Sequence, residues 1–166
     1  MSFLEVFKTL NKFKVEYVVA GGAAVVLHGY GRLTQDLDLI ILLEKNNLGK
    51  LHDALSSIDF VPKVPVTKEQ LQDEKLRDQW KNEKGMIVFS FVEKNPPFIL
   101  VDIFINDKKL FGRVDKCKKI ANVGGVNVPL ISIEELIRLK KIAGRNKDID
   151  DIVQLRAIKK RLNGHD

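Results

Sequence analysis

Two short apolar runs that contain acidic residues stand out in this chain. The first spans residues 36–43 and contains Asp36 and Asp38, and the second spans residues 98–105 and contains Asp102. Runs of this length, rich in Ile, Leu and Val, predict β-strands. Because side chains alternate between the two faces of a strand, Asp36 and Asp38 should point to the same side. An ionised carboxylate in so apolar a strand is costly unless a countercharge such as a divalent cation compensates it.

The remaining pattern predicts a mixture of helices and strands. Apolar residues at helical spacing predict helices over residues 3–13, 46–57, 68–80, 133–143 and 147–162. Short apolar runs predict further strands over residues 15–20, 86–92 and 126–128, the second of which should form a hairpin with residues 98–105. Residues 62–84 are polar and charged, so we expect a mobile insertion or a substrate-facing lid there. Within it, Trp80 either anchors the segment to the core or stacks on a base.

A pair of glycines, Gly21 and Gly22, lies between a predicted strand and an apolar stretch that is compatible with a helix, residues 23–28. A strand, a glycine turn and a helix start together favour phosphate binding, because glycine lets the backbone approach a ligand closely and free N–H groups attract anions. Each signal also has a plainer interpretation: a glycine pair is often only a turn, an Asp-x-Asp pair is often a solvated face, and Asp102 can cap a backbone group at a strand edge. In combination, a phosphate site beside a metal site indicates a nucleoside triphosphate (NTP) with magnesium.

From Gly21 to Leu39 the chain resembles the signature of the DNA polymerase beta-like nucleotidyltransferase superfamily. That signature is a Gly-Gly or Gly-Ser pair, then roughly nine to thirteen residues, then Asp-x-Asp or Asp-x-Glu between hydrophobic residues. Here the second glycine and Asp36 are separated by residues 23–35. A third carboxylate on a later strand completes the metal site of that family, and Asp102 matches its position. Residues 135–152 further resemble the C-terminal motifs of the AbiEii-type branch, the bacterial abortive-infection toxins.

The resemblance implies an α/β nucleotidyltransferase fold, with a small, mixed, twisted sheet backed by helices and a helical C-terminal portion. The implied reaction transfers a nucleoside monophosphate from an NTP to an acceptor hydroxyl and releases pyrophosphate. Asp36, Asp38 and Asp102 would bind two Mg²⁺ or Mn²⁺ ions, and Asp102 would favour deprotonation of the acceptor. Gly21 and Gly22 would hold the triphosphate through backbone N–H groups.

The resemblance also assigns roles to residues outside the two strands. Lys140 would neutralise phosphate charge in the transition state. The resemblance also implies that three residues orient the nucleotide or the acceptor: Lys147, Asp148 and Asp151. Apart from the resemblance, the position of Thr34 just before the strand expected over residues 36–43 would let its hydroxyl orient Asp36 or a phosphate. A plainer interpretation remains for each, since Lys and Asp at helical spacing often form exposed i,i+4 ion pairs, and a Thr before a strand often has no special role.

Length and composition are those of one soluble domain over residues 1–166. No apolar stretch approaches the roughly 18 residues of a membrane span, and the N-terminus does not resemble a secretory signal. A single cysteine, Cys117, excludes an intramolecular disulfide and a cysteine-based zinc site. We therefore expect a cytoplasmic protein that does not contact membranes.

The net charge of +6 is unevenly distributed along the chain. Residues 1–107, the expected catalytic sheet core, carry 13 Lys and Arg against 15 Asp and Glu. Residues 108–166, the expected mainly helical portion, carry 15 Lys and Arg against 7 Asp and Glu. Basic clusters in this portion would attract a polyanion over about 10 Å, although solvated helix faces have the same composition. The clusters consist of Lys116, Lys118, Lys119, Lys159, Lys160 and Arg161.

Three hypotheses about the acceptor follow. The basic portion favours an enzyme that acts on tRNA or another RNA, as in toxin–antitoxin systems, where a cognate antitoxin protein would be a partner. A second possibility is an enzyme that modifies a small molecule such as an antibiotic. The third is a non-catalytic member that binds a nucleotide or a partner protein. The chain is short for the toxin branch, and its sequence does not choose the NTP, the acceptor or the oligomeric state.

Overall fold

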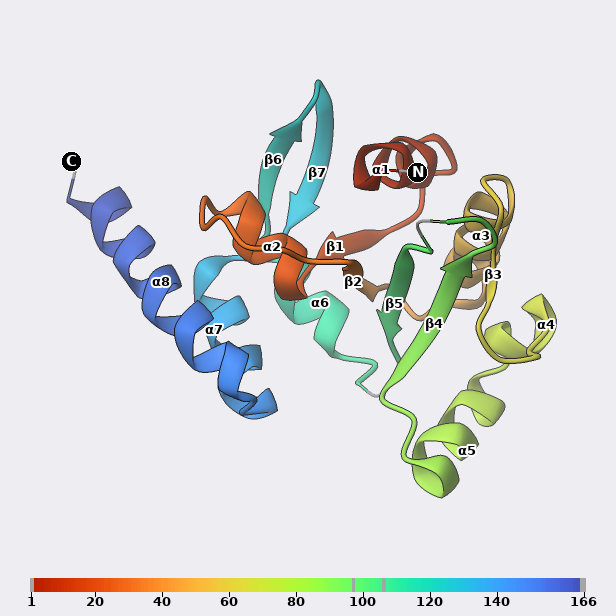
Figure 1. Cartoon of the computed structure of the whole chain (residues 1–166). Helices are drawn as coiled ribbons and strands as arrows, with labels where there is room; N and C mark the ends of the chain where they lie inside the picture. Colours follow the sequence, from red (N-terminus) through yellow and green to blue (C-terminus); the bar gives the residue numbers. More distant parts are fainter. Residues whose placement is uncertain (1, 97, 106, 165–166) are drawn as a thin grey trace.

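The computed structural model describes residues 2–96, 98–105 and 107–164, and these build one seven-stranded sheet (Figure 1). The strands lie in the order β3-β4-β5-β2-β1-β7-β6. The pairs β2–β5 and β1–β7 are parallel, and the other neighbours are antiparallel, so the mixed α/β fold expected from the resemblance is confirmed. The strands are β1 (Tyr17–Val19), β2 (Asp36–Ile41), β3 (Phe60–Pro62), β4 (Val88–Glu93), β5 (Leu100–Phe104), β6 (Lys119–Val123) and β7 (Val126–Leu130).

Helices pack around this sheet. Helix α1 contacts α3 and β7, α2 and α6 both contact β2, and α7 pairs with α8. Figure 1 shows α7 and α8 on the side of the molecule opposite β3 and α4. No helix in the described ranges is long and apolar enough to cross a membrane. The helices are α1 (Phe3–Lys12), α2 (Gly21–Leu27), α3 (Lys45–Ser56), α4 (Lys68–Gln72), α5 (Glu74–Lys84), α6 (Leu110–Asp115), α7 (Ile133–Ala143) and α8 (Asn146–Asn163).

The two faces of the central strands differ in burial, and this positions the site. Burial alternates along β4 and β5, as a period of two requires. On one face, Leu37 of β2 lies opposite Val101 of β5, which in turn lies opposite Phe91 of β4, and all three are fully buried. Each such side chain stabilises the fold by about 1.5–3 kcal/mol. The other face, which carries Asp38 and Asp102, is only partly covered.

The polar segment before β4 packs on the core. The single helix expected over residues 68–80 is two helices, because Asp73 ends α4 and its carboxylate accepts hydrogen bonds from the first turn of α5. Trp80 is buried and stacks on Phe89 with ring centroids 6.1 Å apart, which confirms its role as an anchor. Arg77 is also buried and donates to the carbonyls of Leu71 and Leu43. Both helices therefore contribute buried side chains to the packed structure, unlike the mobile insertion that was one expectation. The other expectation, a substrate-facing lid, stays a prediction.

Strand β6 was missed by sequence reasoning. It pairs with β7 through a turn at Gly124 and Gly125, whose φ values of 55° and 83° suit a two-residue hairpin turn. Lys119 and Ile120 on β6 are exposed, so the strand lacks the alternating apolar pattern by which strands are recognised. The C-terminal portion, expected to be mainly helical, thus also adds β6 and β7 to the sheet through the β1–β7 pair.

Candidate functional site

Two carboxylates lie side by side at the centre of the sheet. In the parallel pair β2–β5, Asp38 is directly opposite Asp102, so both side chains leave the same face. Asp36 lies two residues before Asp38, on the same face, and is exposed at the start of β2. The Oδ1 atom of Asp102 is buried and has no hydrogen-bond partner among the described residues. A buried, unpartnered carboxylate oxygen is unfavourable and points to a missing cation or donor.

The environment of Asp38 disfavours its charged form. Burial and then the neighbouring carboxylate of Asp102 raise the pKa of Asp38, and Asp36 adds to the rise. A hydrogen bond from the backbone N–H of Gly22 and the positive charge of Arg145 oppose it. The balance is a raised pKa, as expected for clustered carboxylates without enough countercharge.

Gly21 is required by the close approach of Asp38, and the backbone N–H of Gly22 hydrogen-bonds to the same carboxylate. Gly21 begins α2 with a φ of 58°, a conformation that L side chains rarely adopt. A Cβ atom on Gly21 would lie 1.7 Å from Oδ2 of Asp38, so any side chain here would displace that carboxylate. The pair is therefore more than a turn, because it forms the wall against which Asp38 is held.

A cleft of about 680 Å³ opens beside these carboxylates. Asp38 and Asp102 line it together with Gly21, while β4, the end of β5, α6 and α7 supply much of the remaining surface. One part of the lining is apolar and includes Phe104 and Leu139. Basic side chains add positive charge to the cleft: Arg113, Arg138, Lys140 and Arg145. The cleft therefore combines acidic, basic and apolar surfaces.

Lys140 belongs to a buried ion-pair network. Its side chain is only 5% exposed, and Nζ donates to Asp151 at 2.6 Å and to Asp148 at 3.2 Å. Both carboxylates are almost completely buried in α8, whereas Lys140 lies on α7. The exposed i,i+4 ion pairs of the plainer interpretation are therefore wrong, because these partners connect two helices in the interior.

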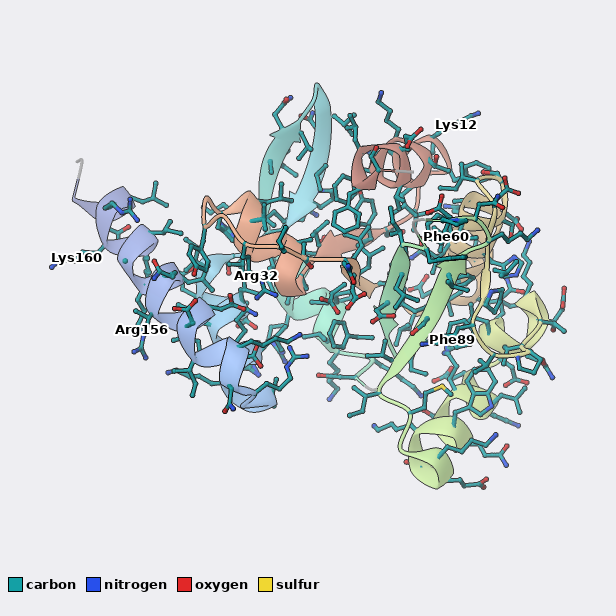
Figure 2. The ribbon with its side chains drawn as sticks, in the orientation of Figure 1. Lys12, Arg32, Phe60, Phe89, Arg156 and Lys160 are labelled. Atoms are coloured by element: carbon teal, nitrogen blue, oxygen red, sulfur yellow. The ribbon has the colours of Figure 1, made fainter. Side chains whose placement is uncertain are left out.

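Two arginines extend this network. Arg145 donates from Nε and Nη2 to Asp148 at 2.8 and 3.3 Å, and Arg32 donates to Asp151 at 2.5 Å. Burial would raise the pKa of Asp148, but hydrogen bonds from Arg145 and Lys140 outweigh it and lower that pKa. Figure 2 shows Arg32 between α2 and α8, so the network ties α8 to the loop before β2.

The structure brings some of the sequence-predicted residues together and separates others. Asp38, Asp102 and the glycine pair gather at one place, whereas Asp36 is exposed at the start of β2 and does not line the cleft. Thr34 donates its hydroxyl to the carbonyl of Asp36 at 3.1 Å, so it braces the start of β2. Lys147 is exposed on α8 and is not among the residues that line the cleft.

Sequence reasoning missed the four arginines of the site. Arg113, Arg138 and Arg145 line the cleft, and Arg32 contacts the buried network. Spacing gave one usable signal, because Arg145 precedes Asp148 by three residues at the start of a predicted helix. Surface arginines elsewhere have the same local spacing, so only the tertiary structure separates these from solvated residues.

Asp38 and Asp102 could supply two of the ligands of a divalent cation. Within the described ranges, no three Asp, Glu, His or Cys side chains are already gathered as a full metal site. Mg²⁺ usually takes one or two protein carboxylates and completes its shell with waters and substrate phosphates. Asp38 and Asp102, with the unpartnered Oδ1 of Asp102, meet that requirement.

Comparison with known proteins agrees with this geometry. The sequence model of a family described as "Nucleotidyl transferase AbiEii toxin, Type IV TA system" matches residues 3–162. No curated protein sequence matches the chain. Three solved structures share the fold of this chain.

An antigenic nucleotidyltransferase-like protein from Paracoccidioides brasiliensis is 20% identical, with a TM-score of 0.57 over 90% of this chain and 71% of that one. A nucleotidyltransferase-type protein from Thermotoga maritima is 16% identical, with a TM-score of 0.57 over 98% and 91%. A lincosamide antibiotic adenylyltransferase with lincomycin bound is 20% identical, with a TM-score of 0.59 over 95% and 98%. At these identities the likeness establishes the fold.

Proposed function

Because this chain belongs to the AbiEii nucleotidyltransferase family, we propose that it transfers a nucleoside monophosphate from an NTP to an acceptor hydroxyl and releases pyrophosphate. The observation that carries the proposal is the pairing of Asp38 with Asp102 on adjacent parallel strands beside a cleft of about 680 Å³. Such a cleft is large enough for a nucleotide-sized ligand. Clustered carboxylates with an unpartnered oxygen lower the stability of the fold, and a bound cation would compensate their charge.

Each residue has a distinct task in this proposal. Asp38 and Asp102 hold Mg²⁺ or Mn²⁺, with Asp36 available at the start of the strand. Bound there, divalent ions would stabilise charge on the attacking and leaving oxygens. Asp102 favours loss of the proton from the acceptor hydroxyl, and the backbone at Gly21 and Gly22 lies against the triphosphate.

The tasks of the C-terminal residues differ from those that the resemblance implied. The ammonium of Lys140 is already paired with Asp148 and Asp151. Its role is therefore to fix these two carboxylates and, through them, the side chains that bind to them. Through the same contacts, Asp148 and Asp151 position Arg145 and Arg32.

The acceptor is either RNA or a small molecule. Membership of a toxin family favours RNA and a cognate antitoxin as partners. The fold is also that of a lincosamide antibiotic adenylyltransferase, so a small hydroxylated acceptor is the second candidate. We favour RNA, because the net charge of residues 108–166 is strongly positive.

The first test is transfer of label from an NTP. With Mg²⁺, one of the four NTPs labelled at the α-phosphate should modify one class of acceptor among tRNA, total protein and small alcohols. The Asp38→Asn/Asp102→Asn variant should transfer none. Glu16→Gln is the control, because Glu16 is an exposed acid just before β1, outside the cleft. Metal-dependent NTP binding without transfer to any acceptor would favour the non-catalytic alternative.

A second test separates the two acceptor classes by salt. If RNA binds the basic clusters, log affinity should fall with log salt concentration by about 0.7–0.9 per phosphate neutralised. Lys118 pairs with Asp115 and Lys159 with Glu134, so the effect of these two lysines should be smaller than that of Lys160. Figure 2 shows Lys160 and Arg156 on the outer side of α8.

The measurement for this test is tRNA binding at several salt concentrations. Wild type is compared with an alanine variant of the two basic clusters, which should lose part of the salt slope. A flat salt response of wild type would contradict the RNA hypothesis and turn attention to the small-molecule acceptor.

A further inference from the structure

Arg145 occupies the junction between α7 and α8 and lines the cleft together with Asp38. Asp102 and Gly21 line the same cleft, so the guanidinium and the two carboxylates face one common space. Arg145 and Asp38 nevertheless form no ion pair within 4.0 Å in the described part of the chain. Arg145 is thus near the proposed metal ligands without being bound to them.

Only one edge of the Arg145 guanidinium is in use. Nε and Nη2 face the two oxygens of Asp148, at 2.8 and 3.3 Å. A guanidinium has five N–H donors, so the outer edge formed by Nη1 and the second hydrogen of Nη2 remains available. The side chain is 58% exposed, which leaves that edge accessible from the cleft. A free guanidinium edge is suited to bidentate binding of phosphate oxygens.

Asp148 holds the guanidinium in place. Its side chain is 1% exposed and also accepts hydrogen bonds from Lys140 and from the backbone N–H of Arg145. A carboxylate fixed by so many donors cannot follow a mobile side chain, so the orientation of Arg145 is set before a ligand arrives. Such preorganisation reduces the entropy lost on binding.

The other cations of the cleft are less available. Lys140 Nζ is bound to two carboxylates. Arg113 pairs with Glu135 at 3.1 Å, and Arg138 approaches the same carboxylate at 3.7 Å. Arg145 therefore has a fixed orientation, an open guanidinium edge and a position in the same cleft as Asp38. None of the other three cationic side chains of the cleft has all three properties.

We propose that Arg145 binds the triphosphate of the NTP through its free guanidinium edge, next to the metal held by Asp38 and Asp102. This inference rests on the proposed function and adds a binding residue to it. Asp148 and Lys140 are then positioning residues that act through Arg145. The substrate is recognised by its polyphosphate, so the contribution of Arg145 should depend on the number of phosphates and little on the base.

Calorimetric titration with Mg²⁺ tests this inference. The affinities of each NTP and of its di- and monophosphate are measured for wild type, Arg145→Ala and Arg145→Lys. Arg156→Ala is the control, because Arg156 is an exposed arginine of α8. Arg145→Ala should weaken NTP binding about 10- to 100-fold, the usual effect of losing a hydrogen bond between charged groups. Monophosphate binding should change little. Arg145→Lys should recover only part of the affinity, because an ammonium cannot bind in a bidentate manner.

The outcomes distinguish this inference from the proposed function. If wild type binds no NTP with Mg²⁺, the proposed function fails, and this inference fails with it. If wild type binds NTP and Arg145→Ala binds equally well, only the inference is overturned. It is also overturned if Arg145→Ala weakens NTP and monophosphate equally while its melting temperature falls, because Arg145 would then serve only to start α8.

Discussion

Replacing Asp102 by Asn should reduce nucleotidyl transfer by about a thousandfold. The change keeps the shape of the side chain and removes the negative charge that the Asp102 carboxylate, with its unpartnered Oδ1, would contribute to the proposed cation site. Loss of a metal ligand removes several kcal/mol of transition-state stabilisation, and each 1.36 kcal/mol is tenfold in rate. The measurement is the initial rate of label transfer at saturating NTP and Mg²⁺, for Asp102→Asn and for the control Glu16→Gln. A rate within about threefold of wild type would show that Asp102 is not a ligand.

The metal-free stability of the aspartate variants provides an independent check. The pKa of Asp38 is raised in the folded state by burial and by Asp102, so ionised Asp38 destabilises the fold. A raised folded pKa contributes stability below the unfolded pKa, and this stability is lost as pH rises through the folded value. Asp38→Asn should therefore be more stable than wild type at pH 7 in EDTA, and the difference should vanish near pH 3.

Urea unfolding at these two pH values is the measurement for this check. A marked loss of stability in Asp38→Asn at pH 7 would mean that the carboxylate is a structural group, held by the N–H of Gly22. The stability curves therefore separate a functional carboxylate from a structural one without any assay of turnover.

The carboxylate pair could be predicted because its signal is local in the sequence. The alternation of strand side chains places Asp36 and Asp38 on one face, and a single acidic residue in an apolar run identifies Asp102. What remained open was the register that sets Asp38 opposite Asp102, since strand pairing depends on the whole sheet.

The cationic side of the cleft could not be predicted in this way. Lys140 lies eight and eleven residues from its two partners, across a helix–helix junction at Gly144. The sequence predicts both helices and the glycine between them, but the depth at which α7 and α8 pack determines whether these charges are buried. The same packing turns Arg145 toward the cleft, and no local pattern contains that information.

Replacing Lys140 by Met should destabilise the fold by about 3 kcal/mol. Removing one partner of a buried ion pair leaves uncompensated charge in the interior, which costs about 3–5 kcal/mol. The lower end of this range applies because two ion pairs remain after the substitution: Asp148 still pairs with Arg145, and Asp151 still pairs with Arg32. The adjacent Lys141 is exposed on the same helix, so Lys141→Met is the matched control and should change stability by less than about 0.5 kcal/mol.

Denaturant unfolding of Lys140→Met, Asp151→Asn and the double variant measures the coupling directly. The double variant should lose less stability than the sum of the single variants, because Asn at position 151 no longer needs a cation. Acid should also reduce the difference in the free energy of unfolding between wild type and Lys140→Met. The lowered pKa of Asp148 contributes stability above its unfolded pKa, and this stability is lost as pH falls through the folded value. If Lys140→Met keeps wild-type stability but loses nucleotidyl transfer, Lys140 acts on the phosphates directly, as the sequence resemblance implied, and the buried network has no structural role.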